Sequence, residues 1–123
     1  LSIRNLTKKR TPNIPFGDLL IKALGTSYEL SLVIADDKLS QKLNRTYRKK
    51  NKPANVLSFP YAKKNGEIIL NIETALREAK DGKISLRERM IILYVHGLAH
   101  LKGFDHGRDM DRFEEKIRRI STR

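Results

Sequence analysis

The segment from Met90 to Leu101 constrains the fold more than any other, because its apolar residues are spread around the whole circumference of a helix. A helix of this kind has no side to turn toward water, so it must lie in the middle of the fold. Ser85 and Glu88, just before it, form the S-x-x-E pattern that caps the start of a helix. The segment is shorter than the roughly 20 residues that span a membrane, and two histidines interrupt it. We therefore expect a central buried helix and no membrane segment.

The rest of the chain alternates between helical and strand patterns. In the first part of the chain, apolar spacing predicts a short strand before residue 8, a helix from Phe16 to Leu24, a strand from Tyr28 to Ala35 and a helix from Asp36 or Asp37 to Arg48. Two strands follow, from Asn55 to Phe59 and from Glu67 to Ile72, and are expected to form a hairpin. The chain then continues with a short helix ending at Gly82, the central helix, and a last helix from Asp109 to Ile120. Pro60 is expected to end the first strand of the hairpin. This order predicts an α/β fold of the α+β type, a single domain over residues 1–123 in which about five helices pack on a small mixed sheet of about four strands.

The charge of the chain indicates an anionic partner. Its 26 Lys and Arg residues exceed its 14 Asp and Glu residues, which gives a formal net charge of +12. On so small a surface this excess favours a nucleic acid, and the alternatives are a protein kept soluble by its charge or one bound to an acidic membrane. The absence of cysteine excludes disulfides, thiolate metal sites and cysteine nucleophiles. No signal peptide is recognisable, and we expect a cytoplasmic protein.

All three histidines of the chain fall within the central helix or just after it. His96 and His100 are four residues apart, a spacing that places two imidazoles on one side of a helix, about 5–6 Å apart and within reach of one ion. Gly103 follows the expected helix end and is able to take the positive φ that reverses the chain, so that His106 returns toward the first two rings. The sequence therefore predicts one divalent metal, zinc by preference, on His96, His100 and His106, at the end of the central helix and the following turn.

Three imidazoles leave a coordination position for water, as in catalytic zinc sites. The spacing is that of metzincin peptidases, in which a glutamate after the first histidine acts as general base. Here that position is Gly97, which argues against peptide hydrolysis. The alternative for each histidine is a packed core residue, although two such rings buried together without a partner would destabilise the fold. Asp105 either orients an imidazole or caps the turn before His106.

The segment from His96 to His106, H-G-L-A-H-L-K-G-F-D-H, resembles the H-G-x-L-H-L-x-G-[YF]-D-H signature of the YbeY family of bacterial endoribonucleases. Further resemblances follow in the order of that family: L-N-R-T-Y-R from Leu43 to Arg48, V-L-S-F-P from Val56 to Pro60, and G-E-I from Gly66 to Ile68. The chain departs from the family at Ala54 and Asn55, where Thr-Asp is usual, and at Ala99, where leucine is usual. None of these positions is an expected metal ligand.

The resemblance implies a zinc-dependent endoribonuclease that prefers single strands and acts in ribosomal RNA processing, at the 3′ end of the small-subunit RNA, and in ribosome quality control. It also implies that Arg48 lies at the active site, where a guanidinium suits the charge that develops on a phosphate. Four further cations are expected to follow the RNA backbone: Arg45, Lys49, Lys50 and Lys52. The expected partners are ribosomal RNA and the small ribosomal subunit. Tyr47 or Phe59 is available for stacking on bases.

Two other functions are compatible with the same residues. One is a metal-dependent hydrolase of a peptide or a small phosphoester, for which an open zinc site is sufficient but the net charge of +12 has no role. The other is a non-catalytic ribosome assembly factor that binds RNA and holds a structural metal. Three imidazoles and a water also suit nickel, iron or cobalt, so the residues alone do not select zinc.

Overall fold

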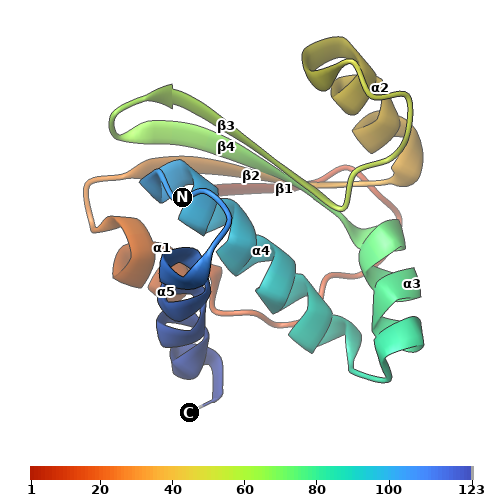
Figure 1. Cartoon of the computed structure of the whole chain (residues 1–123). Helices are drawn as coiled ribbons and strands as arrows, with labels where there is room; N and C mark the ends of the chain where they lie inside the picture. Colours follow the sequence, from red (N-terminus) through yellow and green to blue (C-terminus); the bar gives the residue numbers. More distant parts are fainter. Residues whose placement is uncertain (123) are drawn as a thin grey trace.

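Four strands form a mixed sheet at the centre of the molecule (Figure 1), in a computed structural model that describes residues 1–122. The strands are β1 (Ser2–Asn5), β2 (Glu29–Ala35), β3 (Val56–Ala62) and β4 (Asn65–Asn71), and their spatial order is β1-β2-β4-β3. β1, β2 and β4 run parallel, whereas β3 pairs antiparallel with β4 and forms one edge of the sheet. The predicted α+β fold with a small mixed sheet is confirmed.

Helices cover the two faces of the sheet unequally (Figure 1). They are α1 (Phe16–Leu24), α2 (Asp37–Arg48), α3 (Ile72–Gly82), α4 (Leu86–Lys102) and α5 (Arg108–Arg118), followed by a 3-10 helix over Arg119–Thr122. α2 lies alone above one face, and the other helices lie on the opposite side. β2 is therefore covered on both faces. Leu30, Leu32 and Ile34 belong to the larger core with α1 and α4, and Val33 and Ala35 belong to the smaller core beneath α2.

α4 is the central element of the larger core, as its sequence predicts. It contacts α1, α3, α5, β3 and β4. Ser85 caps its start by accepting a hydrogen bond from the backbone N–H of Glu88, and Gly103 ends it with a φ of 107°. The hydroxyl of Tyr94, a fully buried residue in its middle, donates to the backbone carbonyl of Phe16 in α1 at 2.9 Å. No helix among residues 1–122 is long and apolar enough to cross a membrane.

The β3–β4 hairpin is longer than its sequence pattern predicts. β3 continues past Pro60 to Ala62, and β4 begins at Asn65, so that Lys63 and Lys64 alone connect the strands. A proline is tolerated here because β3 is an edge strand, in which half of the backbone N–H groups have no partner strand. The pairing is irregular just after the proline. The expectation that Pro60 ends the strand was wrong for this reason.

Two helix boundaries also differ from the prediction. Ile72, expected at the end of β4, is the first residue of α3, because the side chain of Asn71 accepts from two backbone N–H groups of the first turn and starts the helix there. The last helix begins at Arg108 and ends at Arg118, and the chain continues as a 3-10 helix. Such a tightened last turn is common at helix ends.

Asp37 joins the start of α2 to α3. Its carboxylate accepts hydrogen bonds from Asn71, Thr74 and Arg77, and the two bonds from Arg77 measure 2.8 and 2.9 Å. The bond from Arg77, above all, lowers the pKa of Asp37 to about 2. These contacts hold the first turn of α2 in place, at the opposite end of the helix from Arg48.

Candidate metal centre

The side chains of His96 and His100 project from the last turns of α4 and face each other. Their Nε2 atoms are 3.1 Å apart, and their ring centroids are 4.6 Å apart with the ring planes at 83°. Both residues are half-buried, whereas Leu98 and Ala99 between them are buried in the core. The four-residue spacing therefore brings two imidazole nitrogens to one point that solvent reaches.

His106 lies beside this pair because the chain reverses after α4. Its ring centroid is 6.1 Å from that of His96 and 5.8 Å from that of His100. Gly103 provides the reversal with its positive φ, and Gly107, with a φ of 140°, turns the chain again into α5. His106 is exposed, so its ring forms the outer side of the cluster. The structure brings all three predicted ligands together.

The spacing of the His96 and His100 nitrogens suits a divalent metal ion. Two nitrogens bound to tetrahedral zinc at ~2.0–2.1 Å are about 3.4 Å apart, close to the 3.1 Å that separates the Nε2 atoms of His96 and His100. Within residues 1–122, no group of three or more His, Asp, Glu or Cys side chains has the geometry of a complete metal site, and the ring of His106 lies farther out than the other two. An ion held by all three imidazoles would need the His106 ring to move toward the other two.

Glu114 on α5 orients His96. Its Oε2 lies 3.2 Å from Nδ1 of His96, and its side chain is only 11% exposed. With its proton on Nδ1, the imidazole donates to this carboxylate and turns the lone pair of Nε2 toward His100. The guanidinium of Arg118, 3.7 Å from the other carboxylate oxygen, balances the charge of Glu114.

Sequence reasoning missed Glu114, although the sequence contains a signal for it. Glu114 lies four residues after Met110 and three before Ile117, both of which are buried. It therefore belongs to the inward face of an amphipathic helix. A carboxylate on a buried face needs a polar partner, and a histidine cluster elsewhere in the chain is a natural one.

The charge of Arg48, the last residue of α2, acts on His100. Burial lowers the pKa of His100 from its usual 6.5, and the charges of His96, His106 and Arg48 lower it further, against a hydrogen bond with the backbone of Phe104 that raises it. A neutral imidazole keeps a lone pair available for a metal. The charge of Arg48, at the end of α2, thus reaches the histidines of α4, a relation that only the family resemblance had indicated.

Gly97 lets α4 pack directly against β3. The hydroxyl of Ser58 donates to the carbonyl of Gly97 at 3.0 Å, and a Cβ at position 97 would lie 3.0 Å from Cδ1 of Ile68 and 3.1 Å from Oγ of Ser58. A side chain there, such as the glutamate that metzincins carry as general base at this position, would require these neighbours to move. This adds a steric reason to the sequence argument against peptide hydrolysis.

Asp105 fixes the backbone of the turn that carries His106. Its Oδ1 accepts from the backbone N–H of His106 at 2.9 Å. Bonds of this kind are typical of aspartate in turns. The carboxylate that contacts an imidazole belongs to Glu114 instead.

A family model described as Endoribonuclease YbeY matches residues 16–122, which include Arg48 and the three histidines. The chain belongs to the YbeY endoribonuclease family.

Three relatives named Endoribonuclease YbeY show how far the similarity extends. The protein from Aquifex aeolicus is 40% identical over 114 residues, which are 87% of this chain and 75% of that protein. The protein from Neorickettsia sennetsu is 35% identical over 115 residues, 80% of each chain. The protein from Ehrlichia canis is 43% identical over 89 residues, 68% of this chain and 58% of that protein.

A solved structure shares the fold of this YbeY chain. A solution structure of a Thermotoga maritima protein superimposes with a TM-score of 0.61, covering 80% of this chain and 71% of that one. The two sequences are 21% identical, so this likeness concerns the fold alone.

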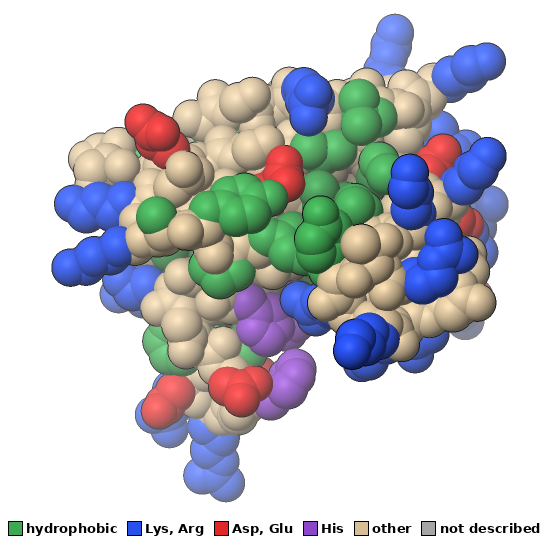
Figure 2. All heavy atoms as spheres, turned by 90° about the horizontal axis from the view of Figure 1, so that it is seen from above, with side chains coloured by type: hydrophobic (Ala, Val, Ile, Leu, Met, Phe, Trp, Pro, Cys, Tyr) green, Lys and Arg blue, Asp and Glu red, His purple; other side chains and the backbone are tan. Residues whose placement is uncertain are grey.

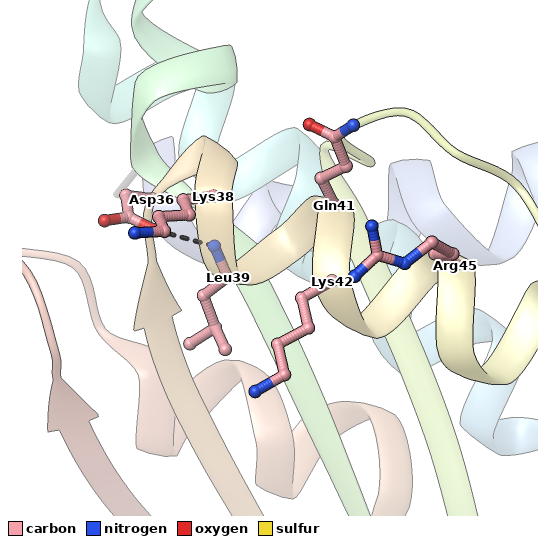
Figure 3. A pocket seen from close by; sticks show the side chains of 6 residues that line it. All are labelled: Asp36, Lys38, Leu39, Gln41, Lys42 and Arg45. Carbon is pink, nitrogen blue, oxygen red and sulfur yellow. Dashed lines mark hydrogen bonds between the residues drawn. The ribbon is translucent and has the colours of Figure 1, made fainter.

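The first of the predicted backbone-binding cations of this YbeY chain is Arg45, on α2. It lines a pocket of about 510 Å³ together with Lys38 and Lys42, which project from neighbouring turns of the same helix (Figure 3). None of the three histidines lines this pocket. Three of its lining side chains are cations, against one carboxylate, Asp36.

The other three predicted cations follow the end of α2. Lys49 ends the helix with a φ of 57°, and Lys50 and Lys52 lie in the loop after it. All three are exposed. Asn44 holds the loop against α2 by donating to the backbone carbonyl of Lys52 at 2.9 Å. The loop therefore exposes three cations directly after Arg48 in the sequence.

Proposed function

We propose that this chain is a zinc-dependent endoribonuclease that cleaves single-stranded RNA. The observation that carries the proposal is the pair of Nε2 atoms of His96 and His100, 3.1 Å apart, with the ring of His106 and the charge of Arg48 beside them. The relatives are named endoribonucleases, and a net charge of +12 suits an RNA substrate. We further propose that it acts in the cytoplasm on ribosomal RNA of the small subunit, in maturation of the 3′ end and in ribosome quality control.

Each residue of the site has a part in such a reaction. His96, His100 and His106 would hold the ion, and zinc supplies a bound water with a pKa lowered toward ~7. Glu114 orients His96, and the lowered pKa of His100 keeps its ring free of a competing proton. Arg48 donates hydrogen bonds to the phosphoryl oxygens and stabilises the negative charge that builds on them.

An RNA cleavage assay with matched variants tests the proposal. The substrate is a labelled single-stranded RNA, with the same sequence in a duplex for comparison. We expect the zinc-loaded parent to cut the single strand in preference, His100→Ala to abolish cleavage, and Arg48→Ala to lower kcat by about 10²–10³-fold. Arg4→Ala is the control, because it removes an exposed arginine from β1 at the opposite edge of the sheet. RNA binding by the variants, measured separately, should persist.

Other results would favour the alternative functions. A parent protein that binds RNA but does not cut it with any divalent metal is an assembly factor. A parent that cuts a peptide or a small phosphoester and leaves RNA intact is a hydrolase of another class. Cleavage of RNA that survives His100→Ala contradicts the proposed ligands.

A further inference from the structure

A pocket lies over the α2 face of the sheet, between α2 and the β3–β4 hairpin. It has a volume of about 260 Å³, and we call it the aromatic pocket because three of its lining residues are aromatic: Tyr47, Phe59 and Tyr61, next to Leu43, Ile69 and Glu67. Figure 2 looks onto this face and shows hydrophobic side chains gathered at its centre, histidine side chains at their margin, and Lys and Arg side chains over the α2 side.

The aromatic rings of this pocket offer surface to a planar ligand. Tyr47 is 66% exposed and Tyr61 is 63% exposed, although most large apolar side chains of residues 1–122 are buried. The rings of Tyr47 and Phe59 meet edge to face, with centroids 5.4 Å apart and planes at 63°. Exposed rings beside a basic surface are the means by which proteins stack the bases of single strands.

The aromatic pocket adjoins the histidine site through two pairs of neighbouring residues. Tyr47 lines the pocket, and the next residue is Arg48, the last residue of α2. Phe59 lines the pocket, and the preceding residue, Ser58, donates to the backbone of α4. Because β3 is an edge strand, the pocket and α4 flank the same edge of the sheet.

Glu67 gives the pocket a defined hydrogen-bonding character. Its Oε1 accepts from the hydroxyl of Tyr61 at 2.8 Å, and its Oε2 accepts from the hydroxyl of Ser31 at 3.1 Å. The bond to Glu67 raises the pKa of Tyr61 to about 12, so this hydroxyl remains a donor. Each carboxylate oxygen has a further lone pair. The two hydrogen bonds therefore fix the orientation of a carboxylate that lines the pocket.

We propose that the aromatic pocket binds one unpaired guanine of the RNA strand that is cut, with Tyr47 stacked on the base and Glu67 accepting from its Watson–Crick edge. Guanine presents two adjacent donors there, N1–H and the 2-amino group, which match the two oxygens of a carboxylate. Adenine and cytosine present a donor beside an acceptor, and uracil presents one donor between two acceptors, so each sets an acceptor against the carboxylate. The inference rests on the proposed endoribonuclease function and adds a base preference to it.

Binding of short oligonucleotides to the full chain tests this inference apart from cleavage. Fluorescence anisotropy is measured with labelled oligouridylates that carry guanosine, inosine or adenosine at one position, since inosine lacks only the 2-amino donor. We expect guanosine to bind about tenfold more tightly than adenosine, with inosine between them, and Glu67→Gln to erase this order. Tyr47→Ala should weaken binding about tenfold and Tyr47→Phe should restore it. Ile21→Ala, which trims a 51% exposed residue of α1, is the control.

The outcomes separate this inference from the proposed function. Equal affinity for the guanosine and adenosine oligonucleotides, or parent-like binding by Tyr47→Ala, overturns the inference even when the parent cuts RNA. A parent that shows the guanine preference but does not cut RNA supports the pocket and refutes the nuclease. The preference should persist in His100→Ala, because that variant alters the histidine site and leaves the pocket intact.

Discussion

Oε2 of Glu114 lies 3.2 Å from Nδ1 of His96, and this contact joins α5 to the ligand-bearing end of α4. The carboxylate approaches the imidazole from the side opposite to Nε2, which faces His100. A histidine that donates one ring N–H to a carboxylate presents its other ring nitrogen to a metal in a fixed orientation. α5 is therefore part of the site, although none of the three histidines lies on it.

Replacing Glu114 by glutamine tests this role. Glutamine keeps the size of the side chain but removes its charge, so we expect the affinity for zinc to fall about 10- to 100-fold. The affinity is measured by competition with a coloured chelator. Glu115→Gln is the matched control, since Glu115 is 64% exposed and pairs with Arg119. Equal affinities in the two variants would show that Glu114 has no role in orienting His96.

Gly97→Ala tests how closely α4 must approach β3 and β4. The added Cβ would lie 3.0 Å from Cδ1 of Ile68 and 3.1 Å from Oγ of Ser58, inside the ordinary contact distance, so these side chains or the helix must give by a few tenths of an ångström. We expect the free energy of unfolding to fall by about 1–3 kcal/mol, measured by urea denaturation. Gly82→Ala, near the end of α3 and with no atom within 4 Å of the added Cβ, should be neutral or slightly stabilising. Equal stability of the two variants would mean that position 97 is not tightly packed.

Spacing within one stretch of sequence was enough to predict which residues meet when they share a helix or the turn after it. His96, His100 and His106 come together for this reason, with Gly103 reversing the chain. Glu114 lies 18 residues from His96 and reaches it only through the packing of α5 on α4, which no local pattern encodes. The extension of β3 past the proline likewise depends on its place at the edge of the sheet, a property of strand order.

The stability of the chain should depend on pH between about 4 and 2 through Asp37. Folding lowers the pKa of this carboxyl to about 2, mainly through the hydrogen bond from Arg77. The contribution of Asp37 to the free energy of unfolding is therefore complete above the unfolded pKa of about 4. It is lost as the pH falls through the pKa of the folded state. Urea denaturation of Asp37→Asn should show a smaller loss of stability over this range than the parent. If the free energy of unfolding fell equally with pH in the parent and in Asp37→Asn, the role given to Asp37 would be contradicted.

RNA binding should weaken with salt through the loop after α2. Each phosphate contact on a single strand contributes a slope of about 0.7 in log affinity against log salt. Lys50→Gln and Lys52→Gln, which remove exposed cations next to Arg48, should each reduce the slope by about that amount. Lys22→Gln on α1, away from this loop, should leave it unchanged. If the affinity of the parent protein for RNA did not change with salt, these contacts would be excluded.

Metal content, measured together with RNA cleavage before and after removal of the metal by a chelator, tests the central claim most directly. We predict about one divalent ion per chain, loss of cleavage on chelation, recovery on addition of one equivalent of zinc, and much weaker binding of the ion by His106→Ala. Full cleavage by a metal-free protein, or retention of the ion by His106→Ala with unchanged affinity, would contradict the three-histidine site.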